Sequence, residues 1–128
     1  MFKKSDFKDF KFNGLTFKIP KDYEASQKRI VAVMPNLEII EDSEGKVVLI
    51  FQAGAQVTSQ FPNIDKFDTV KKVNGMGLKA AKAHGGLSDD DGINYMFKVN
   101  GKWFSIWINQ VLDPISSDLI NNILKDIK

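Results

Sequence analysis

His84 is the single histidine of this 128-residue chain, and three acidic residues, Asp89, Asp90 and Asp91, follow it closely. Histidine and aspartate are ligand types for metal ions, so this segment is the first candidate for a metal site. An EF-hand calcium loop needs an oxygen ligand at its fifth position, where counting from Asp89 gives Ile93. We therefore predict no metal site and interpret the run as a solvated acidic turn, with His84 near the carbonyl end of a helix.

A serine beside the histidine would suggest nucleophilic catalysis, and Ser88 and Asp89 lie close to His84 in sequence. All three would sit in one loop, with nothing to hold them at reacting distance and no evident oxyanion donors. The chain has no cysteine, which excludes thiolate nucleophiles, thiolate metal ligands and disulfides. The sequence therefore predicts a protein that is not an enzyme, and a hydrolase around His84 is the weakest of three functional hypotheses.

The segment Gly75–Ala80 has the letters of a dinucleotide-binding fingerprint. That motif works only when a buried strand precedes it and a carboxylate for the ribose follows about 20 residues later. The residues before it, Val70–Val73, fit a helix face better than a buried parallel strand. We therefore predict no dinucleotide and no other cofactor.

Two tryptophans four residues apart, Trp103 and Trp107, are the leading candidates for binding. On a strand they share one face and form a rigid aromatic shelf, which suits protein or ligand binding. The hairpin predicted at Asn100-Gly101 adds Met96, Lys98 and Asn94 to the same face. The alternative is that a helix covers this face and the tryptophans belong to the core.

The pair Asn100-Gly101 is the strongest local signal, because a type I′ hairpin turn needs two residues that tolerate positive φ. A two-residue loop at this position sets the register of the flanking strands. It predicts apolar pairs on one face, which should be core, and the tryptophan shelf on the other. The core pairs are Phe97 with Phe104, Tyr95 with Ile106 and Ile93 with Ile108; the shelf pairs are Lys98 with Trp103, Met96 with Ser105 and Asn94 with Trp107.

The pair Asn13-Gly14 predicts a second hairpin by the same logic. Its apolar face should lie inward and its polar face outward, and Pro20 should end the second strand. The expected pairs are Phe12 with Leu15, Phe10 with Phe17, Asp9 with Lys18 and Lys11 with Thr16.

The stretch between the two hairpins begins with strands and a loop. Strands are expected at residues 30–34, 37–41 and Val47–Gln52. The third is apolar at five successive positions, which indicates a central strand covered on both faces. Residues 53–62 contain glycine, serine and proline and are predicted to form a loop.

A long helix is predicted over residues 64–83, with Asn63 as its cap. Small and branched residues share one face of this helix, and charged residues lie opposite. Gly75 and Gly77 each weaken a helix by about 1 kcal/mol relative to alanine, so a break near Gly75 is the alternative. The charged face would carry Lys71, Lys72, Lys79 and Lys82 with Asp65 and Asp68, which we interpret as a mixed-charge solvated surface.

The last helix is predicted to open with Asp113 as its cap and Pro114 at its first helical position. Strands, a helix, a hairpin and a terminal helix together predict a single α+β domain over residues 1–128. We expect a twisted antiparallel sheet of about six strands with two principal helices. The apolar stripe of the last helix is Leu119, Ile120, Ile123, Leu124 and Ile127.

The opening of the chain resembles that of the PsbP-like families. The resemblance rests on Asn13-Gly14-Leu15-Thr16-Phe17-Lys18-Ile19-Pro20, followed by Tyr23. Their ending is similar too: a hairpin with a Gly-Lys turn, here Gly101-Lys102, leads into a strand and an amphipathic helix, here Asp113–Lys128. The resemblance implies a PsbP-like fold. Families with this fold have different roles, so it implies no particular function.

Composition and charge bear on the partners. The net charge is only +2, and Arg29 is the single arginine among 18 basic residues, so the bidentate fork that reads guanine is nearly absent. Residues 1–12 lack the apolar run of a signal peptide, and no stretch approaches the roughly 18 apolar residues of a membrane span. We therefore expect a soluble cytoplasmic protein that binds neither nucleic acid nor membrane.

The favoured hypothesis is a non-enzymatic interaction or binding domain. It would contact a protein partner through the exposed sheet face or through the loop around residues 52–62. The alternative is a carrier of a small apolar ligand between helix and sheet, lined by Phe51, Met96, Trp103 and Trp107. The sequence specifies neither the partner, nor the ligand, nor the oligomeric state.

Overall fold

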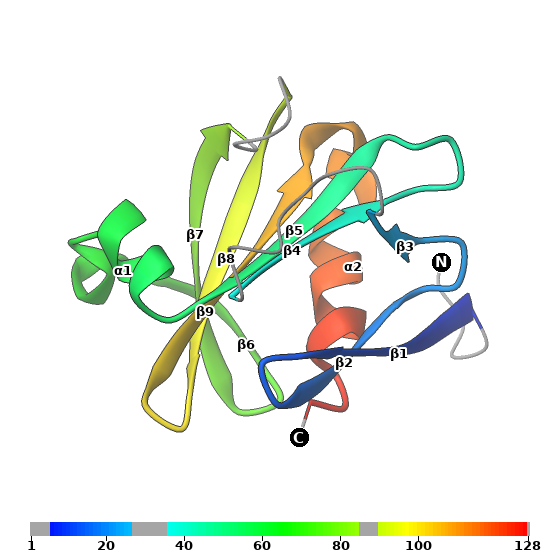
Figure 1. The fold of residues 1–128 in the computed structure, drawn as a ribbon. Coiled ribbons are helices and arrows are strands. Elements are labelled where there is room, and N and C mark those ends of the chain that lie inside the picture. The colour runs from blue at the N-terminus through cyan, green and yellow to red at the C-terminus, as the bar shows by residue number, and fades with distance from the viewer. Residues whose placement is uncertain (1–5, 27–35, 85–89, 128) are drawn as a thin grey trace.

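A computed structural model describes residues 6–26, 36–84 and 90–127 of the chain (Figure 1). The elements in chain order are β1 (Phe7–Phe12), β2 (Leu15–Pro20), β3 (Glu24–Ala25), β4 (Leu37–Glu41), β5 (Val47–Ala53), α1 (Ala55–Gln60), the 3-10 turn η2 (Ile64–Lys66), β6 (Thr69–Val73), β7 (Met76–His84), β8 (Asp91–Val99), β9 (Lys102–Asn109), the 3-10 turn η3 (Gln110–Leu112) and α2 (Asp113–Leu124). The expected strand at residues 30–34 lies outside the described residues.

Strands β3 to β9 form the sheet around which the fold is built. Across the described residues, seven strands follow the order β3-β4-β5-β9-β8-β7-β6, and every pairing is antiparallel. The β1–β2 hairpin is separate and lies with α2 on one side of this sheet, whereas α1 lies toward the other side (Figure 1). The predicted α+β class with a twisted antiparallel sheet is confirmed.

Both predicted hairpins are present with the predicted registers. Phe97 pairs with Phe104 across the β8–β9 hairpin, and Phe10 pairs with Phe17 across the β1–β2 hairpin. Each hairpin turns on an asparagine with positive φ, 51° at Asn13 and 52° at Asn100, as a type I′ turn requires. The Phe97 and Phe104 rings are buried and stacked with centroids 5.7 Å apart, so the predicted core face is confirmed.

The main core lies between the sheet and the layer made by the β1–β2 hairpin and α2. Phe51 is at its centre, with ring centroids 5.0 Å from Phe10 and 5.2 Å from Phe17. Strand β5 is buried from Val47 to Phe51 and lies between β4 and β9, so the predicted central strand covered on both faces is confirmed. From α2, the predicted stripe Leu119, Ile120, Ile123 and Leu124 enters this core fully buried, and Ile127 is half-buried.

The predicted helix over residues 64–83 is wrong. The chain there forms η2 and then the hairpin β6–β7, which turns on a third Asn-Gly pair, Asn74-Gly75, with φ of 51° and 79°. The alanines and lysines of β7 favour a helix locally, but six residues of β7 pair with β8, and that pairing overrides propensity. The predicted helical faces therefore do not exist, and residues 75–80 form a turn and a strand instead of a dinucleotide loop.

Two smaller predictions near the helices also need correction. Residues 53–62, expected to be a loop, contain α1, whose Val57 is fully buried. Asp113, expected to cap the last helix, is instead the first residue of α2, because η3 runs directly into the helix and Leu112 occupies the cap position without a side-chain cap. The two helices are therefore the short α1 and the terminal α2.

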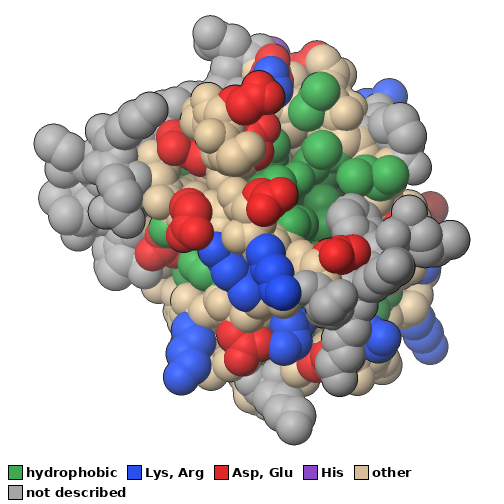
Figure 2. All heavy atoms as spheres, turned by 90° about the vertical axis from the view of Figure 1, so that its right-hand side faces the viewer, with side chains coloured by type: hydrophobic (Ala, Val, Ile, Leu, Met, Phe, Trp, Pro, Cys, Tyr) green, Lys and Arg blue, Asp and Glu red, His purple; other side chains and the backbone are tan. Residues whose placement is uncertain are grey.

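The face on the right of Figure 1 presents charges of both signs. Figure 2 shows apolar side chains gathered in its upper part, with a group of basic side chains below them and acidic side chains spread around both. Interspersed charges of this kind are typical of a solvated surface. No helix within the described residues has the length and apolar character to cross a membrane.

Candidate functional site

The five residues predicted to form a binding face do share one face of the β8–β9 hairpin, but most of them are buried. Met96, Asn94 and Trp107 are 0%, 2% and 2% exposed. Trp103 is half-buried, and the exposed Lys98 places its ammonium 5.5 Å from the centroid of the Trp103 ring, in cation–π range. The solvent-accessible part of this face is therefore mainly Lys98 beside the half-buried Trp103. The two tryptophans do not form an exposed aromatic surface.

Different groups of residues bury the two ends of this face. Val57 of α1 and Ile64 of η2 pack on Met96, with Trp103 half-buried beside them. Trp107 belongs to a separate cluster, and its indole N–H donates a 3.0 Å hydrogen bond to the carbonyl oxygen of Ala83 in β7. The other members of that cluster are Leu37, Ile39, Val47 and Ile50. Met96 and Trp107 therefore belong to the core, as the alternative interpretation of the tryptophan face predicted.

The four residues proposed to line an apolar ligand cavity lie on opposite faces of the sheet. Phe51 pairs with Ile106 and points into the main core. Met96, Trp103 and Trp107 occupy the alternate positions of β8 and β9 and point to the other face. A sheet therefore separates Phe51 from the other three, and they cannot line one cavity.

His84 is the last residue of β7, so the predicted position at the end of a helix is wrong. Its Nδ1 lies 3.0 Å from Oδ1 of Asp91, its partner across the β7–β8 pair, and both side chains are exposed. This pair borders an open hollow of about 350 Å³ that Lys82 and Gln110 also line. The other predicted members of this cluster, Ser88 and Asp89, lie outside the described residues.

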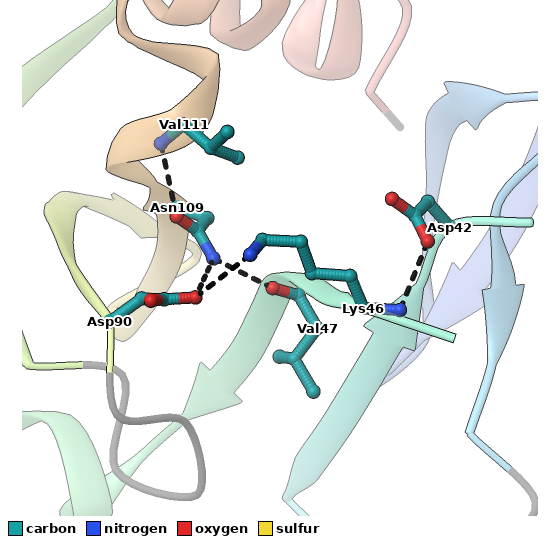
Figure 3. A network of polar contacts seen from close by, with 6 residues as sticks. All are labelled: Asp42, Lys46, Val47, Asp90, Asn109 and Val111. Carbon is teal, nitrogen blue, oxygen red and sulfur yellow. Dashed lines mark hydrogen bonds and ion pairs between the residues drawn. The ribbon is translucent and has the colours of Figure 1, made fainter. Parts of the chain in front are cut away.

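Asp90 does not join His84 but belongs to a polar network at the same end of the sheet (Figure 3). Asn109 is 1% exposed, and its amide donates 2.9 Å hydrogen bonds to the Val47 carbonyl oxygen and to Oδ2 of Asp90. Its Oδ1 accepts a hydrogen bond from the Val111 backbone N–H, and Lys46 Nζ lies 3.4 Å from the same Asp90 oxygen. Among the described residues no three histidine and carboxylate side chains gather as metal ligands. The network therefore ties β5, the residue before β8 and the end of β9 to η3, the turn that leads into α2.

Strand β6 and helix α2 run side by side in the same direction. Lys71 Nζ donates 2.7 Å hydrogen bonds to the backbone oxygen and Oγ of Ser117, and Asn74 Nδ2 donates a 3.5 Å hydrogen bond to the Leu124 carbonyl oxygen. The three residue steps from Lys71 to Asn74 advance the chain by about 10 Å, and the seven helix steps from Ser117 to Leu124 advance it by about 10 Å as well. The two elements therefore stay level along this contact.

A shallow hollow of about 500 Å³ lies between β6 and α2, and we call it the β6–α2 groove. Three lysines and one carboxylate line it together with amide side chains, so its charge is predominantly positive. The lining residues are Lys71, Lys72, Val73, Asn74, Asp118, Asn121, Asn122 and Lys125. The groove offers ammonium and amide donors over most of its length.

Strand β6 is the last strand of the sheet, with no partner strand beyond it among the described residues. Val73 and Met76 flank the two-residue turn and form a hydrogen-bonded pair, so the next pair, Lys72 with Gly77, is a non-hydrogen-bonded one. The backbone N–H and C=O of Lys72 consequently point away from β7. Val70, at an irregularity in the pairing, is 55% exposed. This edge borders the groove and retains hydrogen-bonding capacity.

Lys71 is the innermost cation of the groove. Partial burial lowers the pKa of its ammonium, and the nearby Asp118 carboxylate opposes that shift. The ammonium also lies 5.9 Å from the centroid of the Tyr95 ring. Lys71 thus fastens β6 to α2, whereas Lys72 and Lys125 are exposed at the groove surface.

Comparison with known protein families finds none that matches this chain, and comparison with curated proteins finds no similar sequence. The groove was missed from the sequence because Lys71 and Lys72 were assigned to the solvent face of a helix. The signal that identifies it is Asn74-Gly75, the same dipeptide that marks the other two hairpins.

Proposed function

We propose that this protein is a non-enzymatic interaction domain whose β6–α2 groove holds an extended segment of a partner protein as an added strand. The observation that carries the proposal is the open backbone edge of β6 beside a hollow that α2 closes on its other side. Extended peptides bind such edges through main-chain hydrogen bonds, while neighbouring side chains select the sequence. The proposal moves the binding surface away from the tryptophan face, where most candidate residues are buried.

The character of the β6 edge favours a selective partner over indiscriminate pairing with other strands. The strand is five residues long, has a pairing irregularity at Val70, and carries two lysines. These features discourage unwanted edge-to-edge association. A short edge offers few hydrogen bonds, so a dissociation constant between about 10 µM and 1 mM is expected for an isolated peptide, which corresponds to about 4–7 kcal/mol.

A proline at the edge tests the proposal directly. Because the Lys72 N–H points away from β7, Lys72→Pro removes a donor that the sheet does not use, and the fold should survive. Lys72→Thr removes the same charge but keeps the N–H. Linear peptides selected from a displayed random library on the wild-type protein should lose binding to Lys72→Pro and retain most of it with Lys72→Thr, measured by NMR titration. Peptides that bind both variants equally contradict strand addition at β6.

Two further features belong to the same proposal. The order of elements, from the Leu15–Pro20 strand to the closing hairpin and α2, supports a PsbP-like fold. A chain without cysteine suits the reducing cytoplasm, where we place its partner.

A further inference from the structure

We infer that the segment held in the β6–α2 groove is acidic, with an apolar residue at the end that lies beside Val70. The inference rests on the proposed function and adds the chemistry and polarity of the partner. Its basis is the distribution of charge and exposed apolar surface along the groove.

The charge of the groove selects an acidic strand. Lys71, Lys72 and Lys125 outnumber the single carboxylate, Asp118, and Lys71 already donates to Ser117. Lys72 of β6 and Lys125, which follows the last residue of α2, are both exposed and line the groove from its two sides. Each exposed ion pair of this kind contributes a factor of about 1.4 to 5 in affinity, so two pairs contribute a factor of about 2 to 25.

The same charges disfavour a second copy of this chain as the occupant. Two β6 strands paired edge to edge would bring Lys71 and Lys72 of one copy against those of the other, and like charges directly opposite each other are destabilising. An acidic strand turns this repulsion into attraction. The lysines therefore favour an acidic partner and also protect the edge of β6 against pairing with a second copy of the chain.

The groove also has a polarity along its length. Lys71 is level with Ser117, and stepping back one residue of strand or two residues of helix covers about 3 Å in each case. Val70 and Ile115 lie near the beginnings of β6 and α2, outside the residues that line the groove, and their side chains are 55% and 40% exposed. Lys125, one residue beyond Leu124, is level with the Asn74 end. An apolar side chain fits the Val70 end, and carboxylates fit the Lys72 and Lys125 end.

Paired synthetic peptides test the inference. The acidic probe is a capped strand-forming peptide that has valine at one end and glutamate at alternate positions. The matched probe has glutamine in place of each glutamate. The acidic probe should bind about 2- to 25-fold more tightly at low salt and lose this advantage at high salt. The double variant Lys72→Glu/Lys125→Glu should reverse the preference toward a probe with lysine at those positions. Lys21→Glu, an exposed charge change away from the groove, should not.

The outcomes separate this inference from the function on which it rests. Equal binding of the glutamate and glutamine probes, both abolished by Lys72→Pro, overturns the acidic preference and retains strand addition. Binding of neither probe overturns both. A single-stranded oligonucleotide that competes with the acidic probe and binds Lys72→Pro as tightly as Lys72→Thr indicates a polyanion site and overturns the inference. A valine-to-serine change in the acidic probe should weaken binding severalfold, and no effect contradicts the assigned polarity.

Discussion

Gly92 of β8 lies beneath the indole of Trp107, where no side chain fits. A Cβ at this position would be 2.4 Å from the Ile108 carbonyl oxygen and 2.5 Å from both Cε2 and Nε1 of Trp107. Contacts under 3.0 Å are essentially never seen for a real Cβ, so Gly92→Ala must displace the indole and shift β9. The displaced indole loses its 3.0 Å hydrogen bond to the Ala83 carbonyl oxygen.

The cost of Gly92→Ala has two parts. Overpacking of a buried site destabilises a protein by about 1–3 kcal/mol, and leaving a buried hydrogen-bonding group without its partner costs about 1–3 kcal/mol. We expect the free energy of unfolding to fall by about 2–6 kcal/mol, a large fraction of the roughly 5–15 kcal/mol that is typical of folded domains. At about 4 °C per kcal/mol, the melting temperature should fall by about 8–24 °C.

Urea unfolding followed by tryptophan fluorescence measures this effect. A Trp103→Phe background leaves Trp107 as the emitting group, so the native emission also reports the displacement of its ring. Gly77→Ala is the matched control, because its Cβ would meet the movable Thr69 side chain at 3.2 Å and should cost less than about 1 kcal/mol. If Gly92→Ala costs no more than Gly77→Ala, or leaves the native Trp107 emission unchanged, the close packing of this indole on Gly92 is refuted.

Three other variants test the fold. Asn109→Ala should lower the unfolding free energy by about 2–4 kcal/mol, because three hydrogen bonds are lost at a buried site, and a loss under about 0.5 kcal/mol in urea would contradict the network. Gly75→Ala should destabilise by about 1–2 kcal/mol because φ is +79°, whereas a helix at this position predicts a gain of about 1 kcal/mol. Burial, followed by the charges of Asp42 and Asp22, raises the pKa of Tyr23. The contribution of Tyr23 to stability is therefore complete below the unfolded-state pKa of about 10 and is lost as the pH rises through the higher folded-state pKa. Above about pH 10, Tyr23→Phe should lose less stability than the wild-type protein does. Urea midpoints that fall in parallel for the two proteins as the pH rises would exclude this.

Local chemistry made the hairpins predictable from the sequence. Two successive residues with positive φ are costly for most residue types, so Asn13-Gly14 and Asn100-Gly101, which stand between alternating apolar segments, indicate a reversal of the chain. The strand period of two then sets which side chains share a face, and Phe97 with Phe104 followed without knowledge of any distant residue. The apolar stripe of α2 was predictable for the same reason, since its spacing is local.

Residues 64–83 show where local preference misleads. The alanines and lysines there favour a helix, and the competing signal, Asn74-Gly75, decides the outcome only in combination with β8. Pairing with a strand that begins at Asp91 supplies hydrogen bonds and packing that intrinsic propensity does not include.

The sequence by itself determined the turns and registers of two hairpins and the face to which each of their side chains belongs. Tertiary structure alone decided what covers each face: Val57 and Ile64 bury Met96, and Gly92 leaves room for Trp107 to reach Ala83. It also created the β6–α2 groove, since Lys71 and Ser117 lie 46 residues apart in the chain. Periodicity specifies the direction of a side chain, whereas its cover depends on which distant segment folds against it, and that choice rests on the packing of the whole chain.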